Sequence, residues 1–337
     1  MPSLDSTPVV SVYTSSRDVP QHVKCAMHSS PCRANVILAH LDAIPKSATN
    51  QLWMVCETRG LGEPSSRIEF VLGCFDGSMK AYPIVIFANI DHVPTSEYVR
   101  CRLEDMAKKL MSHVPPSRVF SIFAPDRVAE CFAMEWTKCS GIPREPDSPY
   151  YHANLKYCDK RSFNDQGPHT LEGYTCNARR ATPVDEEKVG MLCHRFAELS
   201  FPFVLTSEEA RNEAAMLIKK GQVWVYEVVP GGGFGEREIA SIVAATRTSC
   251  SVTAITKVVT NDKWLKKGCA RALTGAVTKE LLEINKSVVL YVAHDNPAAS
   301  SVYRRVGFVG PDPLAPSAEE SWKEIGFDRR QVTLGHW

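Results

Sequence analysis

Hydrophobic residues follow a strand, helix, strand, helix pattern in residues 252–308. An aliphatic run at 252–259 ends in a polar turn, and apolar side chains then recur three and four residues apart from Leu273 to Ile284. A second aliphatic run at 288–292 leads into a short helical pattern. Strands that alternate with helices in this way predict an α/β unit with a largely parallel sheet.

The first helix of this segment begins at a turn that reads Lys-Lys-Gly-Cys-Ala-Arg, residues 266–271. A helix N-terminus presents unpaired backbone N–H groups and the positive end of the helix dipole. Because Gly268 and Ala270 are small, a pyrophosphate can approach the backbone, and the basic residues add positive charge. A solvated basic turn without a ligand has the same sequence features, so the turn alone leaves both interpretations open.

As an ordered set, residues 252–308 resemble the acyl-CoA-binding core of the GNAT superfamily of N-acetyltransferases. That family's pattern is (Gln/Arg)-x-x-Gly-x-(Gly/Ala) after a strand, then a second strand, an Asn, and a Tyr ahead of Gly-Phe. Asn296, Tyr303 and the pair at 307–308 stand at the matching places. Leu265 occupies the Gln/Arg position, so one side-chain contribution is missing from the pattern, whereas the backbone of the turn is unaffected.

The resemblance implies that acetyl-CoA lies along a strand edge, with its pyrophosphate on the basic turn. The residues that it assigns to the cofactor are Lys257, Val258, Val259, Lys266, Lys267, Gly268, Cys269, Ala270, Arg271 and Asn296. It makes Tyr303 the general acid that protonates the departing thiolate. An Asn before Pro297 is also a good helix cap, and the two roles of Asn296 are compatible. A thiol at a helix N-terminus is a possible nucleophile, but the family uses the backbone at Cys269, so an acyl-cysteine intermediate is not expected.

The sequence assigns no general base. Many relatives have a carboxylate on the strand before the cofactor turn, whereas residues 252–260 contain no Asp or Glu. Candidates by rough location are Glu227, Glu236, Glu238, His294 and Asp295. A base that acts through water is an equal alternative.

An internal repeat suggests a second copy of the fold. Residues 51–57 and 67–72 predict a β-hairpin, as do 222–227 and 238–243. After each hairpin come a strand, a helix, a strand and a helix. The chain is therefore expected to hold two tandem GNAT-like α/β folds, each a mixed, mostly antiparallel sheet with a central parallel pair flanked by helices.

We place an N-terminal GNAT-like domain at 1–165 and the C-terminal acyl-CoA-binding domain at 170–337. The N-terminal turn at 89–95 contains neither a glycine nor a basic cluster, and its proline offers no N–H donor. This copy is therefore interpreted as degenerate and structural. We also expect a last strand at 331–335. Two helices are expected to be capped, one at Thr182 and one at Thr206 or Ser207. Phe201 and Phe203, between these helices, either line a pocket or pack in the core.

Composition narrows the function classes. Lys and Arg total 39 against 38 for Asp and Glu, a net charge of +1, so nothing indicates a nucleic-acid or membrane-surface partner. The 12 cysteines form no C-x-x-C pair, which favours reduced thiols over a disulfide framework. Because no secretory signal or membrane-length apolar run stands out, we expect a cytoplasmic protein.

One cluster resembles a zinc site, since His22, Cys25, His28 and Cys32 are of the right types at close spacing. On a helix these residues would not share one face, and Pro31 interrupts the run. We therefore expect no metal.

The leading hypothesis is an acetyl-CoA-dependent N-acetyltransferase that acts on a primary amine of a small molecule by direct transfer in a ternary complex. One alternative is a protein or peptide N-acetyltransferase, which the near-neutral charge disfavours. The other is a non-catalytic acyl-CoA-binding protein, which Leu265 and the missing carboxylate keep open.

Overall fold

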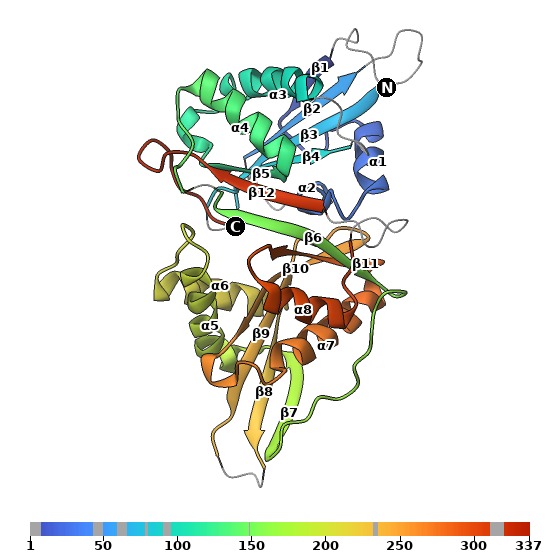
Figure 1. Ribbon diagram of the computed structural model, residues 1–337, viewed down its shortest axis with the longest axis vertical. Coiled ribbons are helices and arrows are strands. Elements are labelled where there is room, and N and C mark those ends of the chain that lie inside the picture. Colours follow the sequence, from blue (N-terminus) through green and yellow to red (C-terminus); the bar gives the residue numbers. More distant parts are fainter. Residues whose placement is uncertain are drawn as a thin grey trace. The chain divides into compact units, whose positions relative to one another are not determined.

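The structure is a computed structural model, and the residues that it describes are 8–42, 50–58, 66–77, 80–89, 96–147, 149–231, 235–310 and 320–337. Contacts divide the chain into an N-terminal unit, Met1–Asn154 with Glu320–Trp337, and a C-terminal unit, Leu155–Glu319. Each unit is described by itself (Figure 1). Most of the turn interpreted as degenerate, the glycine-rich loop at 232–234 and the proline-rich segment at 311–319 lie outside the described residues.

The N-terminal unit is a mixed sheet with helices packed against it. Its elements are β1 (Pro8–Tyr13), α1 (Gln21–Ser29), α2 (Asn35–Leu41), β2 (Gln51–Thr58), β3 (Arg67–Phe75), β4 (Ile84–Ala88), α3 (Ser96–Met111), β5 (Ser121–Pro125), α4 (Asp126–Ser140) and β12 (Glu320–Gly326). The strands are ordered β1-β2-β3-β4-β5-β12, and only β4 and β5 pair in parallel. The core lies between the sheet and the neighbouring helices α3 and α4, where Phe70, Leu103 and Trp136 are fully buried.

The C-terminal unit repeats this plan. Its elements are β6 (Tyr151–Asp159), in which the division between the units falls, β7 (Tyr174–Arg180), α5 (Glu186–Glu198), α6 (Ser207–Lys219), β8 (Val223–Pro230), β9 (Glu238–Thr246), β10 (Val252–Thr260), α7 (Cys269–Ile284), β11 (Ser287–Ala293) and α8 (Pro297–Val306). The strands are ordered β6-β11-β10-β9-β8-β7, and β10 and β11 are parallel. The expected mixed sheet with a central parallel pair is therefore confirmed in both units. The largely parallel sheet that the local pattern suggested is wrong, because the hairpin strands β7, β8 and β9 are antiparallel.

Short polar motifs begin the two helices that precede β8. Thr206 accepts a hydrogen bond from the Glu209 N–H at 3.1 Å, and the Glu209 carboxylate accepts from the Thr206 N–H at 2.9 Å. This reciprocal capping box stabilises the first turn of α6. Thr182 and Asp185 form the same motif before α5, so both predicted helix starts are confirmed.

The chain returns to the N-terminal unit at its C-terminus. β12 pairs antiparallel with β5 from Trp322 to Gly326, and Ile325 and Phe327 are buried in the core of that unit. The last strand is therefore at 320–326, and its prediction at 331–335 was wrong. The apolar residues of 320–327 fill an otherwise open core, whereas 331–335 has no partner strand among the described residues.

The units also differ in extent from the domains expected at 1–165 and 170–337. Contacts place residues 155–170 with the C-terminal unit and 320–337 with the N-terminal unit. The physical reason is strand pairing, because β6 lies next to β11 and β12 lies next to β5. In the described part of the chain, no helix is both long enough and apolar enough to cross a bilayer.

Glu324 on β12 makes the stability of the N-terminal unit sensitive to pH. Its side chain is buried and accepts hydrogen bonds from the Ser121 hydroxyl and the Trp337 indole N–H, each at 2.7 Å. Burial raises the pKa of Glu324 to about 7. Below the ordinary glutamate pKa both folded and unfolded chains hold the proton, whereas between about pH 4.5 and pH 7 only the folded chain does. Stability therefore falls as pH rises through this window.

Glu324→Gln should remove this loss, because Gln is neutral at every pH and keeps one acceptor and one donor. At pH 8 we expect the variant to be more stable than wild type by about 3 kcal/mol, and at pH 4 by nothing. Urea unfolding of both proteins from pH 4 to pH 8 measures the difference. The control Glu97→Gln changes an exposed glutamate of α3 whose pKa is lowered by its hydrogen bond with Arg100, so it should keep the wild-type fall in stability between about pH 5 and pH 7. Parallel profiles for wild type and Glu324→Gln would show that Glu324 is ionised in the folded protein.

Candidate functional site

The later half of β10 has an open edge. Its parallel pairing with β11 spans only Val252–Ala254, opposite Ser287–Val289. Its antiparallel pairing with β9 continues to Thr260, with a shift of register between Ile255 and Lys257. A bulge of this kind bends one strand away from its neighbour. Beyond Ala254 the described strands therefore leave backbone N–H and C=O groups of β10 without a β11 partner, which is an edge that an extended ligand can pair with.

The turn after β10 brings the chain to the start of α7 in a strained conformation. Lys266 has φ +60° and Gly268 has φ +81°. Positive φ is uncommon for a residue with a Cβ and costs about 1 kcal/mol or more, whereas Gly adopts it freely. Such strain is maintained at sites where the backbone has to present its groups in a fixed direction.

Backbone N–H groups converge at the first turn of α7. The first helical hydrogen bond runs from the Ala272 N–H to the Gly268 carbonyl at 3.0 Å. The N–H groups of Cys269, Ala270 and Arg271 precede it and point out of the helix end. Together with the helix dipole they form a site for an anion.

The basic side chains of the turn are on the surface, apart from the half-buried Arg271. Lys266 and Lys267 are exposed, and the Lys267 ammonium lies 4.6 Å from the ring centre of Trp264. Leu265, where the family has Gln or Arg, is half exposed and offers no polar group. The turn therefore keeps the charge and the backbone of the predicted anion site.

The side chain of Lys257 is directed elsewhere. Its ammonium pairs with Glu213 of α6 at 2.6 Å and lies 5.0 Å from the ring centre of Phe196 in α5. Both members of the ion pair are 8% exposed. Only the backbone of Lys257 is left for a cofactor, as it is for Val258 and Val259, which are largely buried.

A single hydrophobic core links the predicted residues of β10, α7 and α8. Cys269 belongs to it, and Val258 and Tyr303 pack against its edge. The Tyr303 ring meets Phe308 edge to face at 5.9 Å, and no described side chain forms a hydrogen bond with its hydroxyl. Burial raises the pKa of the Tyr303 phenol, so the hydroxyl keeps its proton at neutral pH. Burial likewise raises the pKa of the Cys269 thiol to about 11, which makes it a poor nucleophile.

Asn296 caps α8. Its side-chain oxygen accepts a hydrogen bond from the Ala299 N–H at 2.9 Å, and Pro297 follows at the first helical position. The capping role is therefore confirmed, and the exposed amide group leaves its NH₂ as a donor.

The carboxylates considered as general bases are held in ion pairs. Hydrogen bonds from Arg179 lower the pKa of Glu227, and Arg237 also pairs with it. A hydrogen bond from Lys263 lowers the pKa of Glu238. A lowered pKa weakens a carboxylate as a base.

The remaining candidates are on the surface. Glu236 is exposed and pairs with Lys188 at 2.9 Å. His294 and Asp295 are exposed in the loop before α8. The structure therefore distinguishes no side chain as the base.

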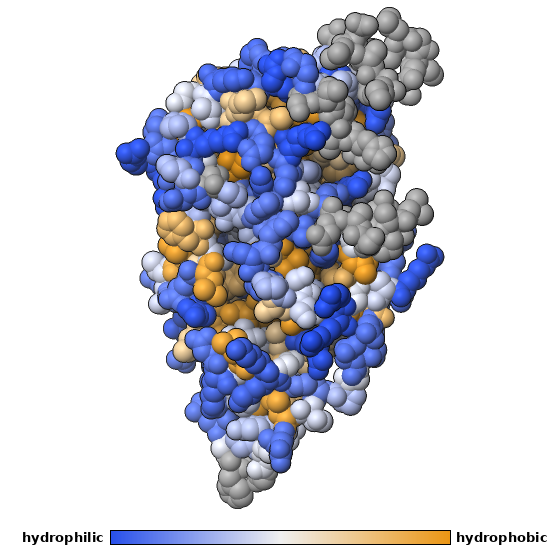
Figure 2. Space-filling model, in the orientation of Figure 1, coloured by the Kyte–Doolittle hydropathy of each residue, from blue (hydrophilic) through white to orange (hydrophobic). Residues whose placement is uncertain are grey.

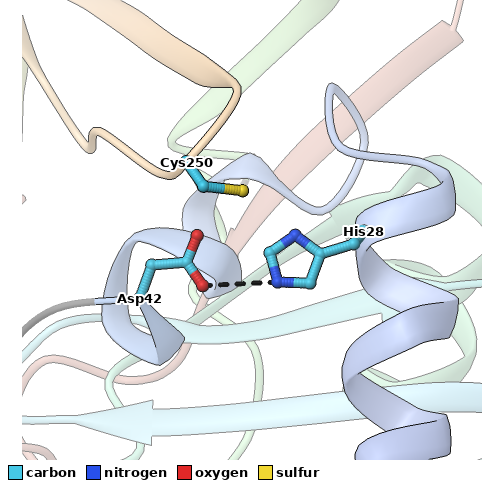
Figure 3. Close-up of side chains that lie close together, drawn as sticks. All are labelled: His28, Asp42 and Cys250. Atoms are coloured by element: carbon cyan, nitrogen blue, oxygen red, sulfur yellow. Dashed lines mark ion pairs between the residues drawn. The ribbon is translucent and has the colours of Figure 1, made fainter.

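Among the described residues, the four side chains considered as zinc ligands, His22, Cys25, His28 and Cys32, do not form a group of ligands. On α1, His22 lies 3.2 Å from Glu57, whereas His28 lies 3.4 Å from Asp42, as Figure 3 shows. Figure 3 also draws Cys250, which is not one of these four residues and belongs to the C-terminal unit. Each histidine faces its own carboxylate, which is the arrangement of a surface ion pair.

The two phenylalanines between α5 and α6 have different environments. Phe203 is buried, whereas Phe201 is 56% exposed. Other exposed apolar side chains occur in the same stretch of the chain, residues 184–204. They are Val184, Met191, Leu199 and Val204. Figure 2 shows apolar surface over this part of the unit. Phe203 therefore packs in the core, and Phe201 is on the surface.

Comparisons with known proteins bear on the fold. Residues 232–311, which contain β10, the turn, α7, β11 and α8, match the family model described as FR47-like protein. A tandem GNAT protein from the clavulanic acid biosynthesis pathway is 14% identical, with 94% of this chain and 98% of that chain covered at a TM-score of 0.50. The chain has a tandem GNAT fold. Two further solved structures share that fold along nearly the whole chain.

One of these is a GCN5-related N-acetyltransferase from Sphaerobacter thermophilus, 15% identical over 97% of this chain and 98% of that chain, with a TM-score of 0.54. The other is a Drosophila protein, 10% identical over 96% and 98% of the two chains, with a TM-score of 0.60. No curated protein matches in sequence. At these identities the structures establish the tandem GNAT fold alone.

Three residues around the candidate site of the C-terminal unit were not predicted from the sequence. They are Glu213, Tyr226 and His169. Glu213 pairs with Lys257, and Tyr226 and His169 lie beside the start of α7. No spacing pattern marks them, because they come from α6, from β8 and from the segment before β7.

Proposed function

We propose that the C-terminal unit binds acetyl-CoA and transfers its acetyl group to a primary amine of a small molecule, directly within a ternary complex. The observation that supports this most is the open edge of β10, which leads to the outward-facing amides of α7 within the FR47-like segment. The pantetheine arm would extend the sheet along β10, and the pyrophosphate would occupy the α7 turn.

In this arrangement the chain's own groups position the reaction. The amine attacks the thioester carbonyl, and a backbone N–H near Val259 stabilises the oxyanion. Tyr303 donates a proton to the departing sulfur. The amine loses its proton to water, since the carboxylates nearest in sequence are ion-paired.

We assign a structural role to the N-terminal unit. On α3, the helix that corresponds to α7, Arg102 is 2% exposed and pairs with Glu69 of β3. The Tyr98 hydroxyl donates to the same carboxylate, and Arg102 also donates to the Thr58 hydroxyl at 3.2 Å. The Arg102 guanidinium is therefore buried and already paired with a carboxylate, so it is not available to bind a phosphate.

A non-catalytic acyl-CoA-binding protein is the second candidate, and the ion-paired carboxylates favour it. Steady-state release of free thiol from acetyl-CoA, measured with a panel of small amines and with peptides, separates the candidates. Thiol release with small amines supports the first proposal. Thiol release with peptides alone would show that the protein is a peptide acetyltransferase instead. Binding without release with any acceptor would leave the non-catalytic protein.

Tyr303→Phe should lower kcat by about 100-fold, the usual contribution of a general acid, and leave acetyl-CoA affinity unchanged. Since the raised pKa keeps the phenol protonated, wild-type kcat should show no alkaline decline from Tyr303 below about pH 10. Steady-state kinetics and calorimetry measure the two effects. The control Tyr174→Phe removes a hydroxyl from a half-exposed tyrosine of β7 and should change neither. Loss of affinity with unchanged turnover per bound cofactor would contradict the assigned role.

A further inference from the structure

Residues 159–170, the connection from β6 to β7, run over the helices of the C-terminal unit. The Asn164 N–H donates to the Val306 carbonyl at the end of α8 at 2.9 Å, and Asp165 pairs with Lys279 of α7 at 2.6 Å. The Ser162 carbonyl occupies the place that a side chain would need at Gly307. Residues 159–170 are therefore fixed against α8 and α7 rather than forming a free linker.

This segment ends with a histidine at the start of α7. The Nδ1 atom of His169 lies 2.8 Å from the Tyr226 hydroxyl of β8. Its Nε2 atom lies 2.7 Å from the position that a Cβ would occupy on Gly268. One ring nitrogen is thus held by a hydrogen bond, and the other faces the residue that begins the anion site.

The Tyr226 phenol that contacts His169 is neutral. Burial raises the pKa of Tyr226, and the thiols of Cys176 and Cys269 close to it raise that pKa further. Burial also raises the pKa of the Cys269 thiol to about 11. Gly268, which the His169 ring faces, belongs to the basic 266–271 turn at the positive end of the α7 dipole. An anion bound on the turn adds a negative charge beside the imidazole and so favours its protonated form.

By standard bond lengths, a phosphate oxygen bound to the Cys269 amide lies within about 10 Å of the His169 Nε2 atom. Charges in a partly buried site interact across this separation, because salt screens them less than it screens exposed charges. His169 is therefore close enough for its charge and that of the pyrophosphate to be coupled.

We propose that His169 completes the anion site at the start of α7 and takes up one proton from solvent when the cofactor's pyrophosphate binds. The proposal rests on the proposed function, because it requires acetyl-CoA on that turn. Cofactor affinity then falls as pH rises, by at most tenfold per pH unit, which is the limit for one linked proton. Residues 159–170, which lie outside the FR47-like match, thereby become part of the cofactor site.

Calorimetric titration of acetyl-CoA at pH 6, 7 and 8, in two buffers of different ionisation enthalpy, tests this by counting the protons taken up. The 3′-phosphate of acetyl-CoA also titrates in this range, so the quantity of interest is the difference between wild type and His169→Gln. Gln can still hydrogen-bond to Tyr226 but never carries a charge. We expect the variant to bind more weakly at pH 6 and to lose most of the proton uptake. His194→Gln, on the surface of α5, should keep the wild-type values.

A second variant shows whether weaker binding of His169→Gln comes from the lost charge or from a disturbed fold around the ring. Tyr226→Phe removes the hydroxyl that holds His169 but keeps the imidazole, so affinity should fall while proton uptake remains. Equal proton uptake in wild type and His169→Gln would overturn the inference and leave the proposed function intact. Absence of acetyl-CoA binding to the wild-type protein at every pH would instead overturn both.

Discussion

Gly268→Asp is expected to abolish acetyl-CoA binding without unfolding the C-terminal unit. The substitution places a carboxylate at the helix end where the pyrophosphate should lie. Two like charges at about 4 Å repel by roughly 4 kcal/mol at the effective dielectric of a protein surface, so affinity should fall by at least about 100-fold. The added Cβ would lie 2.7 Å from the Nε2 atom of His169, so the imidazole ring must rotate away. The backbone should tolerate the change, because Asp is among the residues that best adopt positive φ and is a favourable helix N-cap. Calorimetric titration with acetyl-CoA measures the loss.

Gly275→Asp is the matched control. It adds the same carboxylate to the same helix, at a glycine whose added Cβ would meet no atom within 4 Å and whose φ is not positive. Acetyl-CoA affinity should be unchanged in this variant. If Gly268→Asp bound as tightly as wild type, the pyrophosphate would not lie on the α7 turn. If the wild-type protein did not bind acetyl-CoA, the tandem GNAT fold would not serve as a cofactor-binding fold in this protein.

The fold was predictable where hydrophobic periodicity and cap residues act locally. The α7 repeat from Leu273 to Ile284 and the capping box at Thr206 each determine an element through neighbours in sequence. The pairing of the last strand, β12, with β5 of the N-terminal unit was not predictable in this way. Whether the apolar residues of β12 complete the N-terminal or the C-terminal sheet depends on which edge strand is open, and that is a property of the tertiary structure.

In the candidate site too, local motifs were predictable from the sequence, whereas contacts between distant residues were not. The turn at 266–271 and the cap at Asn296 are contiguous motifs whose backbone role follows from their residue types, and the structure shows the conformations that those roles require. His169 approaches Gly268 across a large separation in sequence, and its position depends on how the chain wraps around α8. Lys257 was predicted to offer its backbone to the cofactor, and nothing in the sequence indicated that its side chain pairs with Glu213 of α6. Sequence patterns therefore predict backbone sites better than they predict side-chain partners.

Lys257→Met is expected to destabilise the C-terminal unit by about 3–5 kcal/mol, because it leaves the buried Glu213 carboxylate without its partner. The double variant Lys257→Met/Glu213→Leu should recover most of this loss, since two apolar side chains of similar volume replace the ion pair. Urea unfolding of wild type, both single variants and the double variant gives the coupling energy. The control Lys279→Met breaks an ion pair of the same 2.6 Å length between exposed residues and should leave stability unchanged within error.

The double variant also tests how β10 contributes to the site. If the cofactor pairs with the backbone of 257–259, removing the Lys257 charge should leave acetyl-CoA affinity unchanged in the folded double variant. A large loss of affinity there would show that the ammonium itself acts on the cofactor, for example by opening away from Glu213 when the cofactor binds. A single-variant cost below about 1 kcal/mol would instead show that water reaches the pair, because only a desolvated charge is costly to leave unpaired. The same proteins thus separate the contribution of the buried pair to folding from any contribution to binding.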